Sequence, residues 1–197
     1  MAMDYVLDRR VAVPALVGDP DDFLFVTGLG GTSRDIGHLT GDGPNLFALG
    51  GAMGAALSTG LGLALARPDR RVMVVTGDGE LLMGVGTLAT IAVLDPANLS
   101  VLCVDNGHYL ETGGQVTHTG RGTDLEAMAR GAGFRITAKV ASEADIEHGR
   151  AILRDASGCS FVLARVAPTE PPSAKRDMDA GAARLRMKAF LAEGKPA

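Results

Sequence analysis

The sequence predicts an α/β domain built on a doubly wound, six-stranded parallel sheet. Its 197 residues are enough for one domain with a sizeable core. Six short segments are apolar and rich in β-branched residues, helical segments separate them, and loops containing glycine follow several of them. Continuous apolar strands that alternate with helices are typical of a parallel sheet covered on both faces.

The expected strands span residues 23–27, 46–49, 71–76, 99–104, 135–140 and 160–166. Helices are expected after the second strand and at 81–94, 124–131 and 143–155. The helix at 81–94 carries no charge, so we expect it to be buried on all sides. The helix after the second strand has a face of small residues that allows close packing on another element, formed by Gly54, Ser58, Gly62 and Ala66.

Residues 46–66 also lack charge and are long enough to span a bilayer. However, five glycines interrupt this run, and Phe47 is its one aromatic residue. Interfacial aromatics are therefore missing, and a strand, a turn and a helix are favoured over a membrane span. We expect no membrane partner.

Composition excludes other classes. The net charge is -4 and no long basic run occurs, which argues against nucleic-acid binding. Cys103 and Cys159 form no CxxC pair and lie in or beside expected strands, as core thiols in a reducing compartment do. The charged residues near the N-terminus do not resemble a secretory signal. We therefore expect a cytoplasmic protein.

The expected domain spans residues 1–167. From residue 168 onward, prolines and mixed charges predict a C-terminal arm (168–197) that leaves the domain and carries an amphipathic helix at 176–191. Neither an internal repeat nor a low-complexity tract is visible in the sequence.

Two polar motifs follow neighbouring strands: residues 76–80 read TGDGE and residues 105–109 read DNGHY. Ligands bind outside the carboxyl ends of parallel strands, and a right-handed crossover places both motifs at one edge of the sheet. Asp78 and Asn106 are therefore expected to converge and to suit Mg²⁺, which prefers oxygen ligands and completes its shell with phosphate. The amides of Gly79 and Glu80 would favour an anion.

The alternative is structural: Asp78 caps a helix and residues 105–107 form a turn. Either motif alone favours this alternative, whereas the two together at this spacing favour a site for a metal and a diphosphate.

The motif GDG, followed by Asn after just under thirty residues, resembles the signature of thiamine-diphosphate enzymes. The resemblance implies that the side chains of Asp78 and Asn106 and the carbonyl of His108 bind Mg²⁺. It also implies that the backbone amides of Gly79 and Glu80 hold the diphosphate and that Gly77, Asn106 and Tyr109 belong to the cofactor-binding set. Many members of the family have Ser where Glu80 stands, so a carboxylate here is a departure from the pattern.

Two further loops resemble the family. In residues 50–54 (GGAMG), Gly51 and Met53 match the loop whose bulky apolar residue wedges between the two cofactor rings, although a core-filling Met is the alternative. Thr32 and Ser33 match a second diphosphate loop after the first strand. A nicotinamide fingerprint is the rival there, but the third glycine is missing.

Residues 20–168 resemble, more narrowly, the small subunits of sulfopyruvate decarboxylases and the matching domain of phosphonopyruvate decarboxylases. The resemblance implies thiamine diphosphate and Mg²⁺ as cofactors and a small anionic 2-oxo acid as substrate. It also implies a hetero-oligomer with a separate pyrimidine-domain (alpha) subunit, because no second sheet and no activating glutamate are found here. Arg34 is a candidate for binding the anionic group of the substrate; pairing with Asp35 or Asp42 is its alternative.

His108, Glu111 and His118 follow the metal motif and are candidates for facing the substrate, with solvated loop residues as the equal alternative. Two other functions remain open: an acetolactate-synthase-like carboligase subunit that uses the same cofactor half, and a non-catalytic cofactor-binding partner. The presence of Asp78, Asn106 and Met53 argues against a non-catalytic partner.

Overall fold

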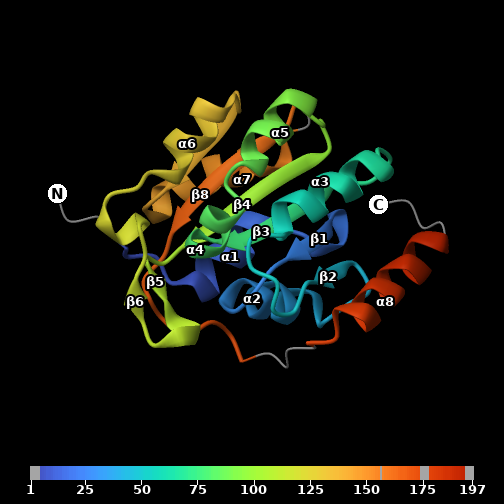
Figure 1. Cartoon of the computed structure of the whole chain (residues 1–197), viewed down its shortest axis with the longest axis horizontal. Helices are drawn as coiled ribbons and strands as arrows, with labels where there is room; N and C mark the ends of the chain where they lie inside the picture. Colours follow the sequence, from blue (N-terminus) through green and yellow to red (C-terminus); the bar gives the residue numbers. More distant parts are fainter. Residues whose placement is uncertain (1–4, 156, 174–177, 194–197) are drawn as a thin grey trace.

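The computed structural model describes residues 5–155, 157–173 and 178–193. A six-stranded parallel sheet in the order β2-β1-β3-β4-β8-β7 forms its centre (Figure 1). The strands are β1 (Leu24–Thr27), β2 (Leu46–Ala48), β3 (Val72–Gly77), β4 (Leu99–Asp105), β7 (Ile136–Val140) and β8 (Ser160–Arg165). The predicted fold class and the six predicted strands are confirmed.

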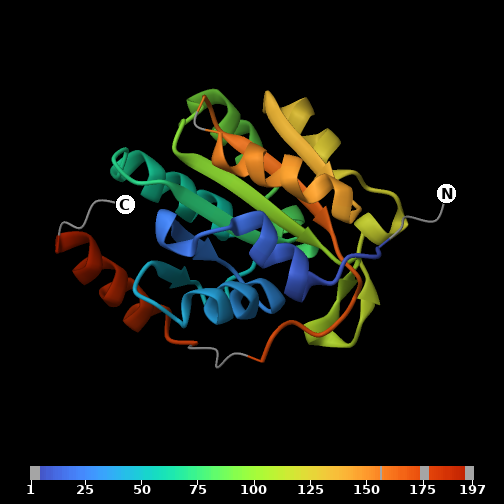
Figure 2. The ribbon, with the colours of Figure 1, turned by 180° about the vertical axis from the view of Figure 1, so that it is seen from behind.

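Alternation along the buried strands gives the sheet one core on each face. In β1, for example, Leu24 and Val26 face one core and Phe25 faces the other. The first core is covered by α3 (Ala56–Ala66), α5 (Thr87–Leu94) and α6 (Leu125–Ala132). The second, nearer the viewer in Figure 2, is covered by α1 (Arg9–Val17), α2 (Gly31–Thr40) and α7 (Ile146–Arg154).

The register brings the carboxyl ends of the central strands together. Gly77 at the end of β3 pairs with Val104 near the end of β4. Helix α4 (Asp78–Met83) begins directly after β3, and α2 begins a few residues after β1. After β4 the chain forms an antiparallel hairpin of β5 (His108–Tyr109) and β6 (Gln115–Val116). One edge of the sheet thus collects the loops on which the motifs lie.

The single buried helix predicted at 81–94 is wrong in two respects. The segment forms α4 and α5, separated by residues 84–86. A Cβ at Gly84 would lie 2.2 Å from the carbonyl oxygen of Gly54, so the glycine permits a close approach of the preceding loop. The apolar residues are also not buried on all sides, because Val93 is 84% exposed.

Three residues of the predicted small-residue face, Ser58, Gly62 and Ala66, are exposed on α3, whereas Gly54 lies before the helix and packs against Met83 and Gly84. Gly60, on another side of the helix, makes the close approach: its Cβ would lie 2.1 Å from Val74 Cγ2. Together α3, α4 and α5 present an exposed set of residues without charge, which we call the uncharged surface: Ser58, Gly62, Leu65, Ala66, Met83, Ala89, Thr90, Val93 and Leu94.

The C-terminal segment returns to the sheet instead of leaving it. Glu170 and Pro171 pass the cavity described below, and α8 (Ala180–Ala192) lies against β2 with Ala183 and Met187 buried (Figure 1). The predicted helix began at Arg176, which lies outside the described residues. Within the described part of the chain, no helix is long and apolar enough to cross a membrane.

Candidate functional site

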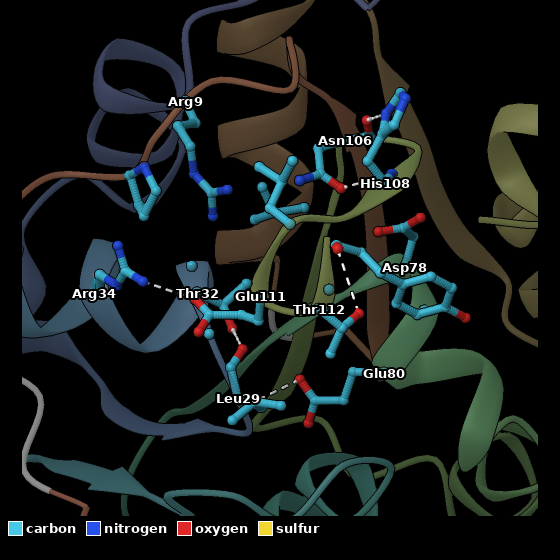
Figure 3. Close-up of a pocket in the computed structure, with 18 of the residues that line it drawn as sticks. Arg9, Leu29, Thr32, Arg34, Asp78, Glu80, Asn106, His108, Glu111 and Thr112 are labelled. Atoms are coloured by element: carbon cyan, nitrogen blue, oxygen red, sulfur yellow. Dashed lines mark hydrogen bonds and ion pairs between the residues drawn. The ribbon is translucent and has the colours of Figure 1, made fainter. Parts of the chain in front are cut away.

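A cavity of about 290 Å³ opens at the carboxyl ends of β1, β3 and β4. Figure 3 shows side chains from separate loops converging on it. Its polar lining includes Arg9, Thr32, Arg34, Asp78, Glu80, Asn106, His108, Tyr109, Glu111, Thr112 and Glu170. Met53, Gly77 and Gly79 also line it. The structure thus brings together most of the residues selected from the sequence.

Asp78 is the first residue of α4, but it does not cap the helix. The N-cap is Gly77, and no side chain caps this end. Asp78 Oδ2 accepts hydrogen bonds from Thr117 Oγ1 at 2.5 Å and from Thr119 Oγ1 at 2.8 Å. No other hydrogen bond reaches Asp78 from the residues that the structure describes. The capping alternative for Asp78 is therefore wrong, and its Oδ1 is left without a protein donor.

A second carboxylate, which the sequence reading treated only as part of a turn, lies behind Asp78. Asp105 is fully buried at the end of β4; its Oδ1 accepts from the amide of Gly107 at 3.0 Å and lies 2.7 Å from Thr119 Oγ1, whose single proton is shared between Asp105 and Asp78. Burial, and then the charge of Asp78, raise the pKa of Asp105 to about 6.

Asn106 is buried and lines the cavity. Its Oδ1 accepts from the backbone amide of His108 at 3.0 Å, and the carbonyl oxygen of Asn106 lies 3.0 Å from His108 Nδ1. The turn predicted at 105–107 therefore exists, and it holds the Asn106 amide at the cavity. A carbonyl oxygen has two lone pairs, so this bond leaves Asn106 Oδ1 able to bind a cation.

Glu80 turns its side chain under the loop that follows β1. Its Oε2 lies 3.4 Å from the amide of Leu29, and its buried Oε1 has no hydrogen-bond partner among the residues that the structure describes. A Cβ at Gly28 would overlap Glu80 Oε1, so the absence of a side chain at Gly28 lets the Glu80 carboxylate take this position. Burial raises the pKa of Glu80 to about 7, although the hydrogen bonds that it accepts act in the opposite direction.

Gly79 allows a second close approach, because a Cβ there would lie 2.1 Å from the ring of Tyr109. The ring therefore packs on the backbone of α4 at the cavity wall. The amides at the start of α4 carry no side-chain cap, and neither do those of α2 after its N-cap Gly30. Two helix N-termini at one cavity favour an anionic group.

Of the two residues predicted in the loop after β1, Thr32 lies at the cavity and Ser33 does not. Thr32 lines the cavity, and its hydroxyl donates to the carbonyl of Leu29 at 3.3 Å. Ser33 is buried, and its hydroxyl is bonded to the carbonyl of Gly28 and to Thr27 Oγ1. The side chain of Ser33 is therefore held inside the loop rather than at the cavity.

Arg34 lies at the rim and bonds two carboxylates. Its Nη2 lies 2.7 Å from Glu111 Oε1, and its Nη1 lies 3.4 Å from Glu170 Oε2 (Figure 3 draws the first contact). The alternatives that pair Arg34 with Asp35 or Asp42 are thus not the contacts seen. Glu111 faces the cavity as part of this ion pair.

Sequence reasoning missed Arg9. Its guanidinium is buried against Gly31 at the start of α2, and its Nε lies 3.1 Å from Asp35 Oδ1. Burial raises the pKa of Asp35, and the hydrogen bond and charge of Arg9 oppose this. No local pattern distinguishes Arg9, the first residue of a nine-residue helix, because arginines at such positions are usually solvated.

Besides Ser33, two other predicted residues lie away from the cavity lining. His118 is exposed between the buried Thr117 and Thr119, and Gly51 is exposed in the loop before α3. Met53 does line the cavity. Whether it separates two rings of a cofactor stays a prediction.

The residues fit a hard cation with a diphosphate. Asp78 Oδ1 and Asn106 Oδ1 are oxygens of the kind that Mg²⁺ prefers, beside helix amides without caps. Within the described residues there is no cluster of three or more His, Cys, Asp or Glu side chains that could hold a metal. An ion at Asp78 would therefore need amide, carbonyl and phosphate oxygens to complete its shell.

Comparison with known proteins agrees with this geometry. Residues 35–164 match the family model described as thiamine pyrophosphate enzyme, C-terminal TPP binding domain. The chain is 37% identical over 146 residues to sulfopyruvate decarboxylase subunit beta of Methanocaldococcus jannaschii, covering 74% of this chain and 76% of that protein. It is 40% identical to the subunit beta of Methanothermobacter thermautotrophicus, covering 66% and 69%.

Longer proteins are also similar. The chain is 38% identical to phosphonopyruvate decarboxylase of Streptomyces viridochromogenes, covering 81% of this chain but 40% of that protein. Among solved structures, a putative thiamin diphosphate-dependent enzyme from Mycobacterium smegmatis has a TM-score of 0.66 at 24% identity, covering 82% of this chain and 32% of the other. A 2-oxoglutarate:ferredoxin oxidoreductase from Magnetococcus marinus has 0.61 at 18%, covering 95% and 89%. These two share the fold.

Proposed function

The chain belongs to the thiamine pyrophosphate enzymes, whose C-terminal TPP-binding domain it matches, and from this we propose that it is the diphosphate-binding subunit of a 2-oxo acid decarboxylase. The observation that carries the proposal is the convergence of Asp78 and Asn106 beside two helix N-termini without side-chain caps. The names of the similar sulfopyruvate and phosphonopyruvate decarboxylases support the reaction class.

In this proposal, Asp78, Asn106 and the carbonyl of His108 hold Mg²⁺. The amides of Gly79 and Glu80 hold the diphosphate, together with Thr32 and the start of α2, and Met53 and Tyr109 contact the remainder of the cofactor. When bound, thiamine diphosphate supplies the nucleophilic carbon and the electron sink that loss of carbon dioxide requires. The protein supplies the position and the charge balance. We assign no role to His118 or to Gly51.

The proposed substrate is a small 2-oxo acid with a second anionic group, a sulfonate or a phosphonate. Arg34 supports this, because its planar guanidinium lies at the cavity rim and can bind two oxygens. Its contact to Glu170 involves a carboxylate whose side chain is 81% exposed, so a substrate anion can replace it at little cost. Glu111 would keep Arg34 oriented toward the cavity.

A separate subunit is proposed to complete the site. Three similar proteins are named as a beta subunit, and this chain spans 40% or less of the similar phosphonopyruvate decarboxylases. The cavity is at the small end of the usual range for ligand sites, as expected for one wall of a shared site. The uncharged surface, which begins beside the cavity at Met83, is the apolar face that such a subunit would cover.

The test is co-expression with the protein encoded beside this chain, followed by assays of carbon dioxide release. The panel is pyruvate, a branched 2-oxo acid, benzoylformate, sulfopyruvate and phosphonopyruvate, with Mg²⁺ and thiamine diphosphate. We expect little activity from the single chain and turnover of a sulfonated or phosphonated acid by the complex. Products joined from two keto acids would indicate a carboligase instead. Full turnover by the single chain would contradict the need for a partner.

A further inference from the structure

Two buried threonines after the β5–β6 hairpin hold the carboxylate of Asp78. Thr117 is 1% exposed and Thr119 is 0% exposed, and their hydroxyl oxygens lie 2.9 Å apart. Both hydroxyls contact Asp78 Oδ2. Neither residue lines the cavity. Of the residues that line the cavity, Asp78 is therefore the one that their hydroxyls contact in the described part of the chain.

The backbone explains how residues so far along the chain reach Asp78. The amide of Thr117 donates to the carbonyl of Gly107 at 2.8 Å, which folds the loop back onto the end of β4. A Cβ at Gly120 would lie 2.9 Å from the same carbonyl, so this return needs a glycine. Alternation then buries Thr117 and Thr119 and leaves His118 exposed.

Both hydroxyl contacts to the Asp78 carboxylate are to Oδ2, which leaves Oδ1 for a cation. Two donors on Oδ2 restrict the rotation of the carboxylate, while Oδ1 receives no hydrogen bond from the described part of the chain. A carboxylate held in this way keeps one oxygen directed to the cavity without the entropy cost of being ordered by the ion.

We infer that Thr117 and Thr119 are positioning residues that fix Asp78 for the metal, an inference that rests on the proposed function. Partners of metal ligands typically contribute ten- to hundredfold in metal affinity. The two are not equivalent. Thr119 Oγ1 also lies 2.7 Å from Asp105 Oδ1, and its single proton serves only one carboxylate at a time. Thr117 has Asp78 as its one carboxylate contact, so its loss should cost more.

The experiment measures metal affinity rather than turnover. The full-length chain, assembled with its partner, is titrated with Mn²⁺ at saturating thiamine diphosphate, and free Mn²⁺ is followed by electron paramagnetic resonance. Thr117→Val and Thr119→Val should weaken Mn²⁺ binding about ten- to hundredfold, with the larger loss at Thr117. Thr117→Ser and Thr119→Ser, which keep the hydroxyl, should bind Mn²⁺ nearly as the native chain does.

The matched control is Thr137→Val. Thr137 Oγ1 donates to Glu126 Oε1 at 2.6 Å, so this change removes a threonine–carboxylate bond away from the cavity and should leave Mn²⁺ affinity unchanged. Native affinity in both valine variants, or equal losses in serine and valine variants, would overturn the inference. Should a valine variant fail to fold, the alanine variant is measured by the same criterion. Native affinity in Asp78→Asn would instead overturn the proposed metal site itself.

Discussion

Replacing Glu80 with glutamine should make the cofactor-free protein more stable at pH 8 than the native chain. The side chain of Glu80 is buried, and its Oε1 has no partner. Burial raises its pKa from 4.5 to about 7. The folded protein therefore binds this proton more tightly than the unfolded chain does, and the free energy of unfolding falls as the pH rises between these two values.

Because the pKa of Glu80 rises from 4.5 to about 7, the free energy of unfolding at a pH above 7 is about 3 kcal/mol lower than at a pH below 4.5. Glutamine has nearly the same shape and stays neutral, so the variant should escape this loss while keeping an acceptor for the amide of Leu29. Asp105 also has a raised pKa, but it is present in both proteins and cancels in the difference.

The assay is urea denaturation at pH 5, 6, 7 and 8 with a chelator and without thiamine diphosphate. The stability advantage of Glu80→Gln should grow with pH by up to about 3 kcal/mol. Glu147→Gln is the control, since its side chain is 77% exposed and it should follow the native profile. A stability difference between variant and native chain that stays constant from pH 5 to pH 8, or a variant less stable than the native chain at pH 8, would refute the idea that ionisation of Glu80 destabilises the fold.

Four further substitutions test the proposed site and the uncharged surface. Asp78→Ala should remove most of the affinity for thiamine diphosphate, because the proposed ion loses its charged protein ligand, and calorimetry with and without chelator would show it. Arg34→Leu should raise KM for a sulfonated or phosphonated 2-oxo acid about tenfold or more, since about 1.5–3 kcal/mol of charge-assisted hydrogen bonding is lost. KM for pyruvate should stay nearly unchanged. An equal change of KM for both acids would contradict the proposal that Arg34 binds the second anionic group. Leu65→Glu and Val93→Glu should weaken assembly with the partner without lowering the melting temperature of the single chain, as size-exclusion chromatography and thermal melting would report.

The fold was predictable because its strands are encoded locally. Each of the six strands is a short apolar run, and the register of a parallel sheet then places the ends of β3 and β4 together. Asp78 and Asn106 could be paired from this topology alone. The same reasoning passed over α1, because Pro14 lies inside this short helix, although its buried apolar residues Ala12, Val13, Leu16 and Val17 do recur at helical spacing.

What the sequence did not predict depends on tertiary contacts. The uncharged helix at 81–94 was expected to be buried on all sides, yet burial depends on which elements pack against it, and Val93 of α5 is exposed, as is Leu65 of α3. The division between α4 and α5 follows from Gly84 meeting the loop at Gly54, a contact between segments thirty positions apart. In the Thr-His-Thr segment the histidine attracted attention, although the buried threonines hold Asp78.

The charges at the cavity explain why metal and diphosphate should bind together. The acidic lining residues outnumber the basic ones, and they are Asp78, Glu80, Glu111 and Glu170 against Arg9 and Arg34. Both arginines are already paired, Arg9 with Asp35 and Arg34 with Glu111. Helix N-termini contribute only partial positive charge. A diphosphate entering alone would therefore meet a net negative wall, and a divalent cation at Asp78 reverses the local field that repels it.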